Sequence, residues 1–286
     1  MQSVWKLTVT VSDVEAAEEA LERYGALAQA VTPLSMGGRD PKQPRHVMEA
    51  YFTNQPDART LQQHLPNHMD FVVEILPDLD WVSESQRGLK PVDVPPFFVH
   101  GSHDRANVPP GRMGLEINAG EAFGTGHHET TTGCLKMMLR QLKSAAPRRA
   151  ADIGCGTGVL AIALARLTRQ RVVAGDIDPI AVRTTDYNAR LNHVGTLVET
   201  FVAAGFNSAA LRRHAPFDLI VANILADPLR RLAPDFRRYL MPGGHLIVSG
   251  LLVSQESSVV ASMRFQGLTL MDRLRIGEWT TLRFQG

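Results

Sequence analysis

The stretch ADIGCGTGVLAIALARL, Ala151 to Leu167, is the strongest indication of fold class in the sequence. Its apolar start predicts a strand, and the apolar residues after Gly158 recur at the spacing of a helix. Between these segments, Gly154, Gly156 and Gly158 let the backbone turn tightly and approach a ligand closely. Such a loop is either a plain turn from strand to helix or a ligand-binding loop at a sheet edge. The surrounding residues decide between these two roles.

Near-continuous apolar runs alternate with helical patterns from about residue 130 onward: RAADIGC (149–155), RVVAGDID (171–178), FDLIVANI (217–224) and HLIVSGLL (245–252). Buried parallel strands have this character because helices cover both faces of their sheet. We therefore expect residues 111–286 to form one α/β domain of the doubly wound type.

The front of the chain has a different pattern. It predicts the order β-α-β-β-α-β, with strands over 4–11, 27–34, 46–53 and 71–76 and helices over 14–25 and 58–65. This order suggests a small α+β domain of the ferredoxin-like type over residues 1–77. Prolines in the segment 78–110 suggest a connector with some short strands of its own.

The charges are divided unevenly along the chain. The formal net charge is +1, but residues 1–100 carry −6 and the remainder carries +7. The two cysteines form no CxxC pair, which disfavours a disulfide framework and a thiolate zinc site. The N-terminal residues lack the pattern of a signal peptide, and no run approaches the ~20 apolar residues that cross a bilayer. We expect a cytoplasmic protein.

The glycine loop has the spacing GxGxG. It lacks the GK[ST] of a phosphate-binding P-loop, and it departs from the GxGxxG of dinucleotide-binding enzymes, which weakens the dehydrogenase interpretation. Asp176 ends the next strand, 22 residues after Gly154, close to the ~20 at which an acid meets a ribose. The alternative role for Asp176 is a helix N-cap, which Asp178 before Pro179 fits better.

Strand, DxGxGxG loop, helix, strand and acid together resemble the S-adenosylmethionine-dependent methyltransferases, which have a seven-stranded Rossmann-like sheet. The fourth strand of such a domain usually carries a residue that faces the methyl group, and Asn223 stands at that place in FDLIVANILADPL. A solvated loop residue is the alternative for Asn223. Its position favours the site, because ligands collect at the carboxyl ends of these strands.

Five motifs in order resemble the PrmA family, the methyltransferases of large-subunit ribosomal protein eleven: AFGTGHHETT, DIGCGTGVLAIAL, GDIDP, VANILADPL and MPGGHLIVSGLL. They cover about half of the chain, and AFGTG followed by paired polar residues and TT is the most diagnostic. The segment DWVSESQRGLKP and the acidic front domain also fit, less specifically.

The resemblance implies a set of contacts with S-adenosylmethionine. The cofactor contacts expected from it are Thr131, Gly154, Asp176 and Asn223, and the loop over the methionine end is Phe123, Gly124, Thr125 and Gly126. Gly156 and Ile177 complete the expected cofactor site. The chain has HHE where many relatives have THP, so the role of His128 transfers better than that of His127.

Neither histidine predicts a metal site. Adjacent side chains point in different directions, and no third ligand follows at a recognisable spacing. The threonines after them begin a predicted helix, TTTGCLKMMLRQL, and they cap it, bind the amino acid part of the cofactor, or do both through different residues.

Transfer of a methyl group to an amine requires that the nitrogen lone pair is aligned with the sulfonium methyl group, in a site that excludes water. Our hypothesis is that Asn223 orients the substrate amine while water carries off its proton. By resemblance, the products are trimethylated amines, at lysine side chains and at the α-amine of the substrate's N-terminus.

The acidic front domain predicts a basic protein partner, which agrees with a ribosomal protein substrate and disfavours direct reading of nucleic acid. An inert acidic surface is the alternative. We expect a monomer that does not contact membranes. The competing functions are an RNA or small-molecule N-methyltransferase on the same fold, a cofactor-binding regulator without catalysis, and a dehydrogenase. Asn223-Ile224-Leu225 lacks the Asn-Pro-Pro-aromatic tetrad that is associated with methylation of glutamine or adenine amino groups.

Overall fold

The computed structural model describes residues 4–11, 28–33, 46–52, 55–57, 60–61, 71–76, 91–118, 128–144 and 146–286. The chain divides into two compact units, Met1–Trp81 and Val82–Gly286.

The first unit contains a four-stranded antiparallel sheet. Its strands are β1 (Val4–Val11), β2 (Ala28–Pro33), β3 (His46–Phe52) and β4 (Phe71–Leu76), in the order β2-β3-β1-β4. Leu7 lies opposite Ala50, and both are buried on one face of the sheet. The four expected strands are confirmed. The expected helix over 14–25 and most of the one over 58–65 lie outside the described residues, so the ferredoxin-like assignment stays a prediction.

A seven-stranded sheet dominates the second unit. Its strands are β8 (Ala150–Ile153), β9 (Val172–Asp176), β10 (Val198–Val202), β11 (Phe217–Asn223), β12 (Leu240–Leu252), β13 (Thr269–Ile276) and β14 (Trp279–Gln285). The order is β10-β9-β8-β11-β12-β14-β13, and every strand runs in the same direction except β14, which is antiparallel to β12 and β13. This confirms the doubly wound α/β fold. The order reverses between β8 and β11, where ligands bind in such sheets.

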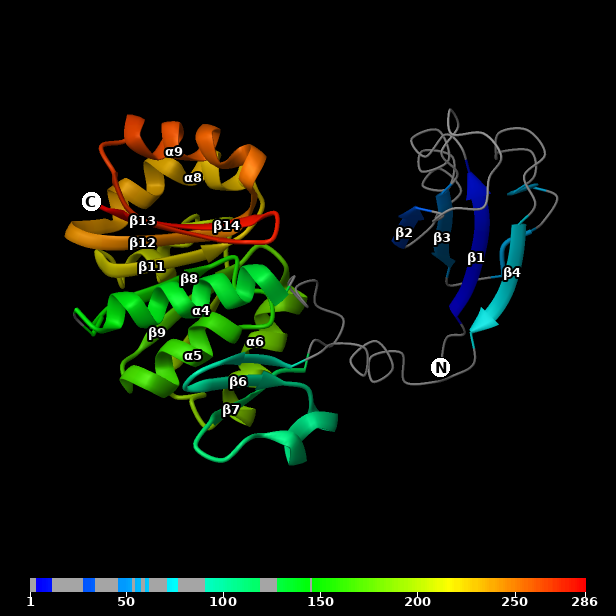
Figure 1. The fold of residues 1–286 in the computed structure, drawn as a ribbon, viewed down its shortest axis with the longest axis horizontal. Coiled ribbons are helices and arrows are strands. Elements are labelled where there is room, and N and C mark those ends of the chain that lie inside the picture. The colour runs from blue at the N-terminus through cyan, green and yellow to red at the C-terminus, as the bar shows by residue number, and fades with distance from the viewer. Residues whose placement is uncertain are drawn as a thin grey trace. The chain divides into compact units, whose positions relative to one another are not determined.

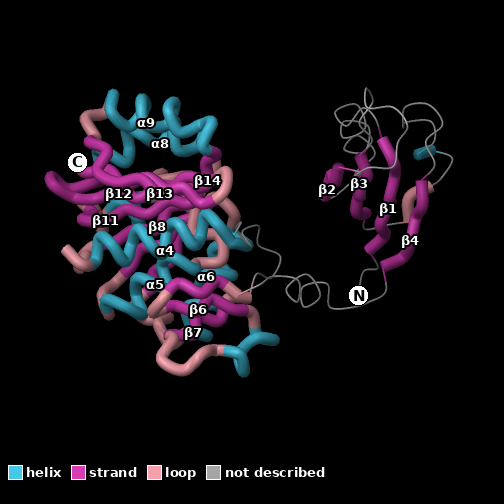
Figure 2. Tube along the Cα trace, in the orientation of Figure 1, coloured by secondary structure: helices cyan, strands magenta, loops and turns pink. Residues whose placement is uncertain are grey.

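Helices cover both faces of this sheet (Figures 1 and 2). One face packs against α4 (His128–Leu142), α5 (Val159–Thr168) and α6 (Pro179–Leu191), and the other against α7 (Ala209–Arg212), α8 (Ala226–Tyr239) and α9 (Glu256–Phe265), which follows the short 3-10 helix η2 (Val253–Gln255). Within β11, Val221 belongs to the first hydrophobic cluster, and Ile220 and Ala222 belong to the second. Both faces are thus apolar, which explains the continuous apolar runs of the sequence.

A small sheet completes the second unit. It consists of β5 (Val92–Val94), β6 (Phe97–His100) and β7 (Met113–Glu116), with the 3-10 helix η1 (Ser102–Asn107) between the last two strands. Phe97 and Leu115 are fully buried in the cluster that also contains α4 and α5. The second half of the connector expected over 78–110 is therefore part of this unit, because its apolar side chains complete the core beside α4.

Across the described parts of the chain, every helix is too short or too polar to span a lipid bilayer.

Candidate active site

The loop from Gly154 to Gly158 follows β8 and has a conformation that requires glycine. Gly154, Gly156 and Gly158 have φ values of +77°, +53° and +82°, a region that other residues rarely adopt. A Cβ atom on Gly154 would lie 2.2 Å from Cγ2 of Ile224, at the end of β11. At Gly154 the loop therefore packs directly against the residue that follows β11, with no room for a side chain.

Asp176, the expected ribose acceptor, ends β9 beside this loop. Its Oδ2 accepts a hydrogen bond of 2.9 Å from the Gly156 N–H, and its Oδ1 accepts one of 3.0 Å from the Asp178 N–H. Each carboxylate oxygen can accept a further hydrogen bond, so the side chain can serve two ribose hydroxyls as well. Asp178 caps α6 by accepting from the Ile180 N–H at 2.8 Å, as its position before Pro179 predicts. Ile177, between these acids, is 72% exposed.

Asn223 ends β11 and faces the first turn of α4. Its Nδ2 donates to the hydroxyl of Thr130 at 3.3 Å. This contact uses the amino end of the carboxamide and leaves Oδ1 as the end that can accept from a substrate amine. Thr130 and Thr131 are both buried at the start of α4. The structure thus brings Asn223, at the end of β11, into contact with the threonine-rich first turn of α4.

Asp152, the acid of the DxGxGxG pattern, was not among the expected site residues. It lies in β8 with 1% of its surface exposed, and its Oδ2 accepts from the Ala161 N–H at 3.0 Å. Its Oδ1 is buried and has no hydrogen-bond partner among the residues that the structure describes. Burial raises the pKa of this carboxyl to about 7. A buried acceptor without a partner beneath the glycine loop fits a ligand with a cationic amino group.

The two cysteines are buried free thiols. Burial raises the pKa of Cys134 to about 12 and that of Cys155 still further, so both are neutral at pH 7 and neither is a ready nucleophile. The described residues contain no group of three side chains suited to a metal ion.

Part of the expected site lies outside the described residues, namely Phe123, Gly124, Thr125, Gly126 and His127. His128 begins α4, but its side chain is not described. The roles of these residues stay predictions.

The Rossmann-like S-adenosylmethionine-dependent methyltransferases share three features with this chain: the sheet order, the glycine loop after β8 and the acid at the end of β9. Within this class, the profile of the family described as ribosomal protein L11 methyltransferase (PrmA) matches residues 3–286. The chain belongs to this family.

Individual relatives agree with this assignment. A ribosomal protein L11 methyltransferase of Brucella suis is 49% identical over 215 residues, which are 75% of either chain. One of Mesorhizobium japonicum is 49% identical over 212 residues, covering 74% of this chain and 73% of the relative. The crystal structure of a ribosomal protein L11 methylase from Lactobacillus delbrueckii subsp. bulgaricus superimposes with a TM-score of 0.59 at 26% identity, covering 68% of this chain and 96% of that one.

Proposed function

We propose that this protein transfers methyl groups from S-adenosylmethionine to ribosomal protein L11, at lysine side chains and at the N-terminal α-amine. The observation that carries the proposal is the meeting of the glycine loop, Asp176 and Asn223 at the carboxyl edge of one sheet. Family membership and the printed function of the relatives support the same substrate.

For each part of the cofactor, the site contains a residue that can bind it. Gly154 and Gly156 admit it close to the backbone, and Asp176 accepts from the ribose hydroxyls. Ile177 offers an exposed apolar surface to the base. The buried Oδ1 of Asp152 suits the cationic amino group. Thr131 and the residues Phe123, Gly124, Thr125 and Gly126 serve the methionine end, as the family resemblance implies.

The bound cofactor supplies an electrophilic methyl group on a positively charged sulfur. Asn223 orients the attacking nitrogen through Oδ1, because its Nδ2 is held by Thr130. A free lysine has a pKa of ~10.4, and both removal from water and a nearby positive charge lower it. The amine therefore loses its proton to water without a dedicated base.

The first unit is proposed to select the substrate. Residues 1–100 carry a net charge of −6, which attracts a basic ribosomal protein and repels nucleic acid. We place residues 1–77 as the recognition domain and the second unit, which includes β5 and β6, as the catalytic domain of a cytoplasmic monomer.

The alternative is an N-methyltransferase for RNA or a small molecule on the same fold. Isotope transfer from labelled S-adenosylmethionine to separated ribosomal proteins and ribosomal RNA distinguishes the two. We expect label in protein L11 alone, and peptide mass spectrometry then locates it on lysines and the α-amine. Label in RNA with none in protein would reverse the assignment.

A further inference from the structure

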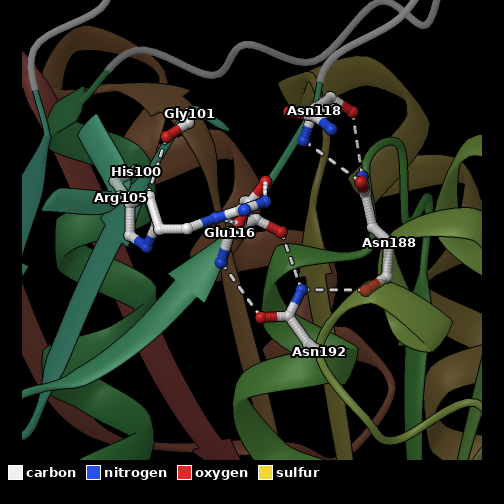
Figure 3. A network of polar contacts seen from close by, with 7 residues as sticks. All are labelled: His100, Gly101, Arg105, Glu116, Asn118, Asn188 and Asn192. Atoms are coloured by element: carbon white, nitrogen blue, oxygen red, sulfur yellow. Dashed lines mark hydrogen bonds and ion pairs between the residues drawn. The ribbon is translucent and has the colours of Figure 1, made fainter. Parts of the chain in front are cut away.

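Asn188 of α6 and Asn192, the C-cap residue of that helix, hydrogen bond to the backbone that leads out of β7 (Figure 3). Asn192 accepts from the Glu116 N–H at 3.0 Å and donates to the Glu116 carbonyl at 2.7 Å. Asn188 accepts from the Asn118 N–H at 3.1 Å and donates to the Asn118 carbonyl at 2.9 Å. Each carboxamide thus pairs with both polar groups of one residue, as a neighbouring strand would.

The spacing of the two asparagines matches the spacing of their partners. Four residues along a helix rise about 6 Å, and two residues along a strand advance about 6.6 Å. β7 is the edge strand of its sheet, with β6 on its other side. Asn188 and Asn192 are 0% and 3% exposed. The two buried carboxamides therefore supply the hydrogen bonds that the backbone at this edge would otherwise need from water.

Asn188 also makes a contact that Asn192 does not. Its Nδ2 donates to the carbonyl of Thr157, in the glycine loop, at 2.9 Å. One turn earlier in α6, the hydroxyl of Thr185 donates to the Gly156 carbonyl at 2.9 Å. Because a trans peptide places its C=O and N–H on opposite sides, holding these carbonyls toward α6 also sets the directions of the N–H groups that follow them.

We propose that Asn188 is a positioning residue for the cofactor: it holds the glycine loop in its binding conformation and ties that loop to the Asn118 backbone. This inference rests on the proposed function, because the loop is taken to bind S-adenosylmethionine. The side chain of Asn188 is fully buried, so it acts on the cofactor indirectly, through its hydrogen bond to the Thr157 carbonyl. Asn192, which has the same residue type, burial and backbone pairing, is the matched control.

The test compares Asn188→Ala and Asn192→Ala with the wild-type full chain. Both changes remove buried hydrogen bonds and lower the melting temperature. Only Asn188→Ala weakens S-adenosylmethionine binding, by about tenfold, as expected for one lost hydrogen bond of ~1.4 kcal/mol acting on the loop. Asn192→Ala stays within about twofold of the wild type. In turnover, the loss in Asn188→Ala falls on the KM for S-adenosylmethionine more than on kcat.

A second readout needs no cofactor. Hydrogen exchange at the amides of residues 156–158 becomes faster in Asn188→Ala and remains at the wild-type rate in Asn192→Ala. Unchanged exchange and affinity in Asn188→Ala, or equal changes in both variants, would overturn the proposal. A wild-type chain that fails to bind S-adenosylmethionine would instead count against the proposed function, and hydrogen exchange would still decide the role of Asn188.

If Asn188→Ala does not fold, Thr185→Val provides the same comparison. This change keeps the side-chain volume and removes the hydroxyl that donates to the Gly156 carbonyl. The proposal requires faster exchange at residues 156–158 and weaker cofactor binding in this variant too. Wild-type behaviour of Thr185→Val would overturn it.

Discussion

Among single residues, Asn223 is proposed to orient the substrate amine through its carboxamide. Asn223→Ala removes the proposed acceptor oxygen, and we expect kcat to fall by about 100-fold with the melting temperature retained. Thr130→Val, which removes the hydroxyl that accepts from Nδ2 but leaves Asn223 in place, should lose less. Steady-state methyl transfer to protein L11 measures both. Near-normal turnover of Asn223→Ala would remove this residue from the mechanism.

The buried Asp152 gives the cofactor-free protein a specific pH dependence. Burial raises the pKa of its carboxyl to about 7, against ~3.9 in an unfolded chain. The folded state binds this proton more tightly, so the contribution to stability is complete below pH ~4 and is lost as the pH rises to ~7. Relative to Asp152→Asn, the wild type should lose roughly 2 kcal/mol of unfolding free energy between pH ~5.5 and ~8. Urea denaturation of both proteins at the two pH values checks this, and a constant difference between them would refute it.

At the element scale, the turn from β8 into α5 is built around a contact with β11. Gly154→Ala would bring its Cβ within 2.2 Å of Ile224 Cγ2 at a φ of +77°, and we expect a loss of about 2–4 kcal/mol of stability from the clash and the backbone strain. Ile224→Ala removes Cγ2, so the double variant should lose less than the sum of the two single changes. Chemical denaturation of the four proteins measures this coupling. Additive losses would show that the contact does not set the turn.

The buried strands could be predicted from the sequence, because burial on both faces requires a continuous run of apolar residues. The runs that became β8, β9, β11 and β12 are apolar on both faces, and the strand ends located Asp176 and Asn223. The pairing of Asn188 with Asn118 could not be found in this way, because its partner lies 70 residues away in the chain. The four-residue spacing of the two asparagines matches the backbone of Glu116 and Asn118 only after the chain folds and β7 lies beside α6. Asp152 did carry a signal, as the acid of DxGxGxG, but its orphaned oxygen is a property of the folded core.

At the scale of the whole molecule, the uneven charge predicts how the protein substrate is recruited. Residues 1–100 carry −6, and attraction between this region and a basic substrate weakens as salt shortens the Debye length from about 14 Å at 0.05 M to about 6 Å at 0.3 M. The KM for protein L11 should rise several-fold over this range, while the affinity for S-adenosylmethionine changes little. Steady-state kinetics with either substrate varied tests this. A KM for protein L11 that does not change with salt would leave the acidic region without a role in recruitment.

All of these assignments depend on the binding of S-adenosylmethionine at the carboxyl edge of the seven-stranded sheet. Calorimetric titration of the cofactor into the full-length chain tests it most directly. We predict saturable one-to-one binding, weakened by at least about tenfold in Asp176→Ala, which removes the proposed acceptor for the ribose hydroxyls. Binding of equal strength in that variant would contradict the placement of the ribose, and a titration without binding to the wild-type chain would contradict the cofactor assignment itself.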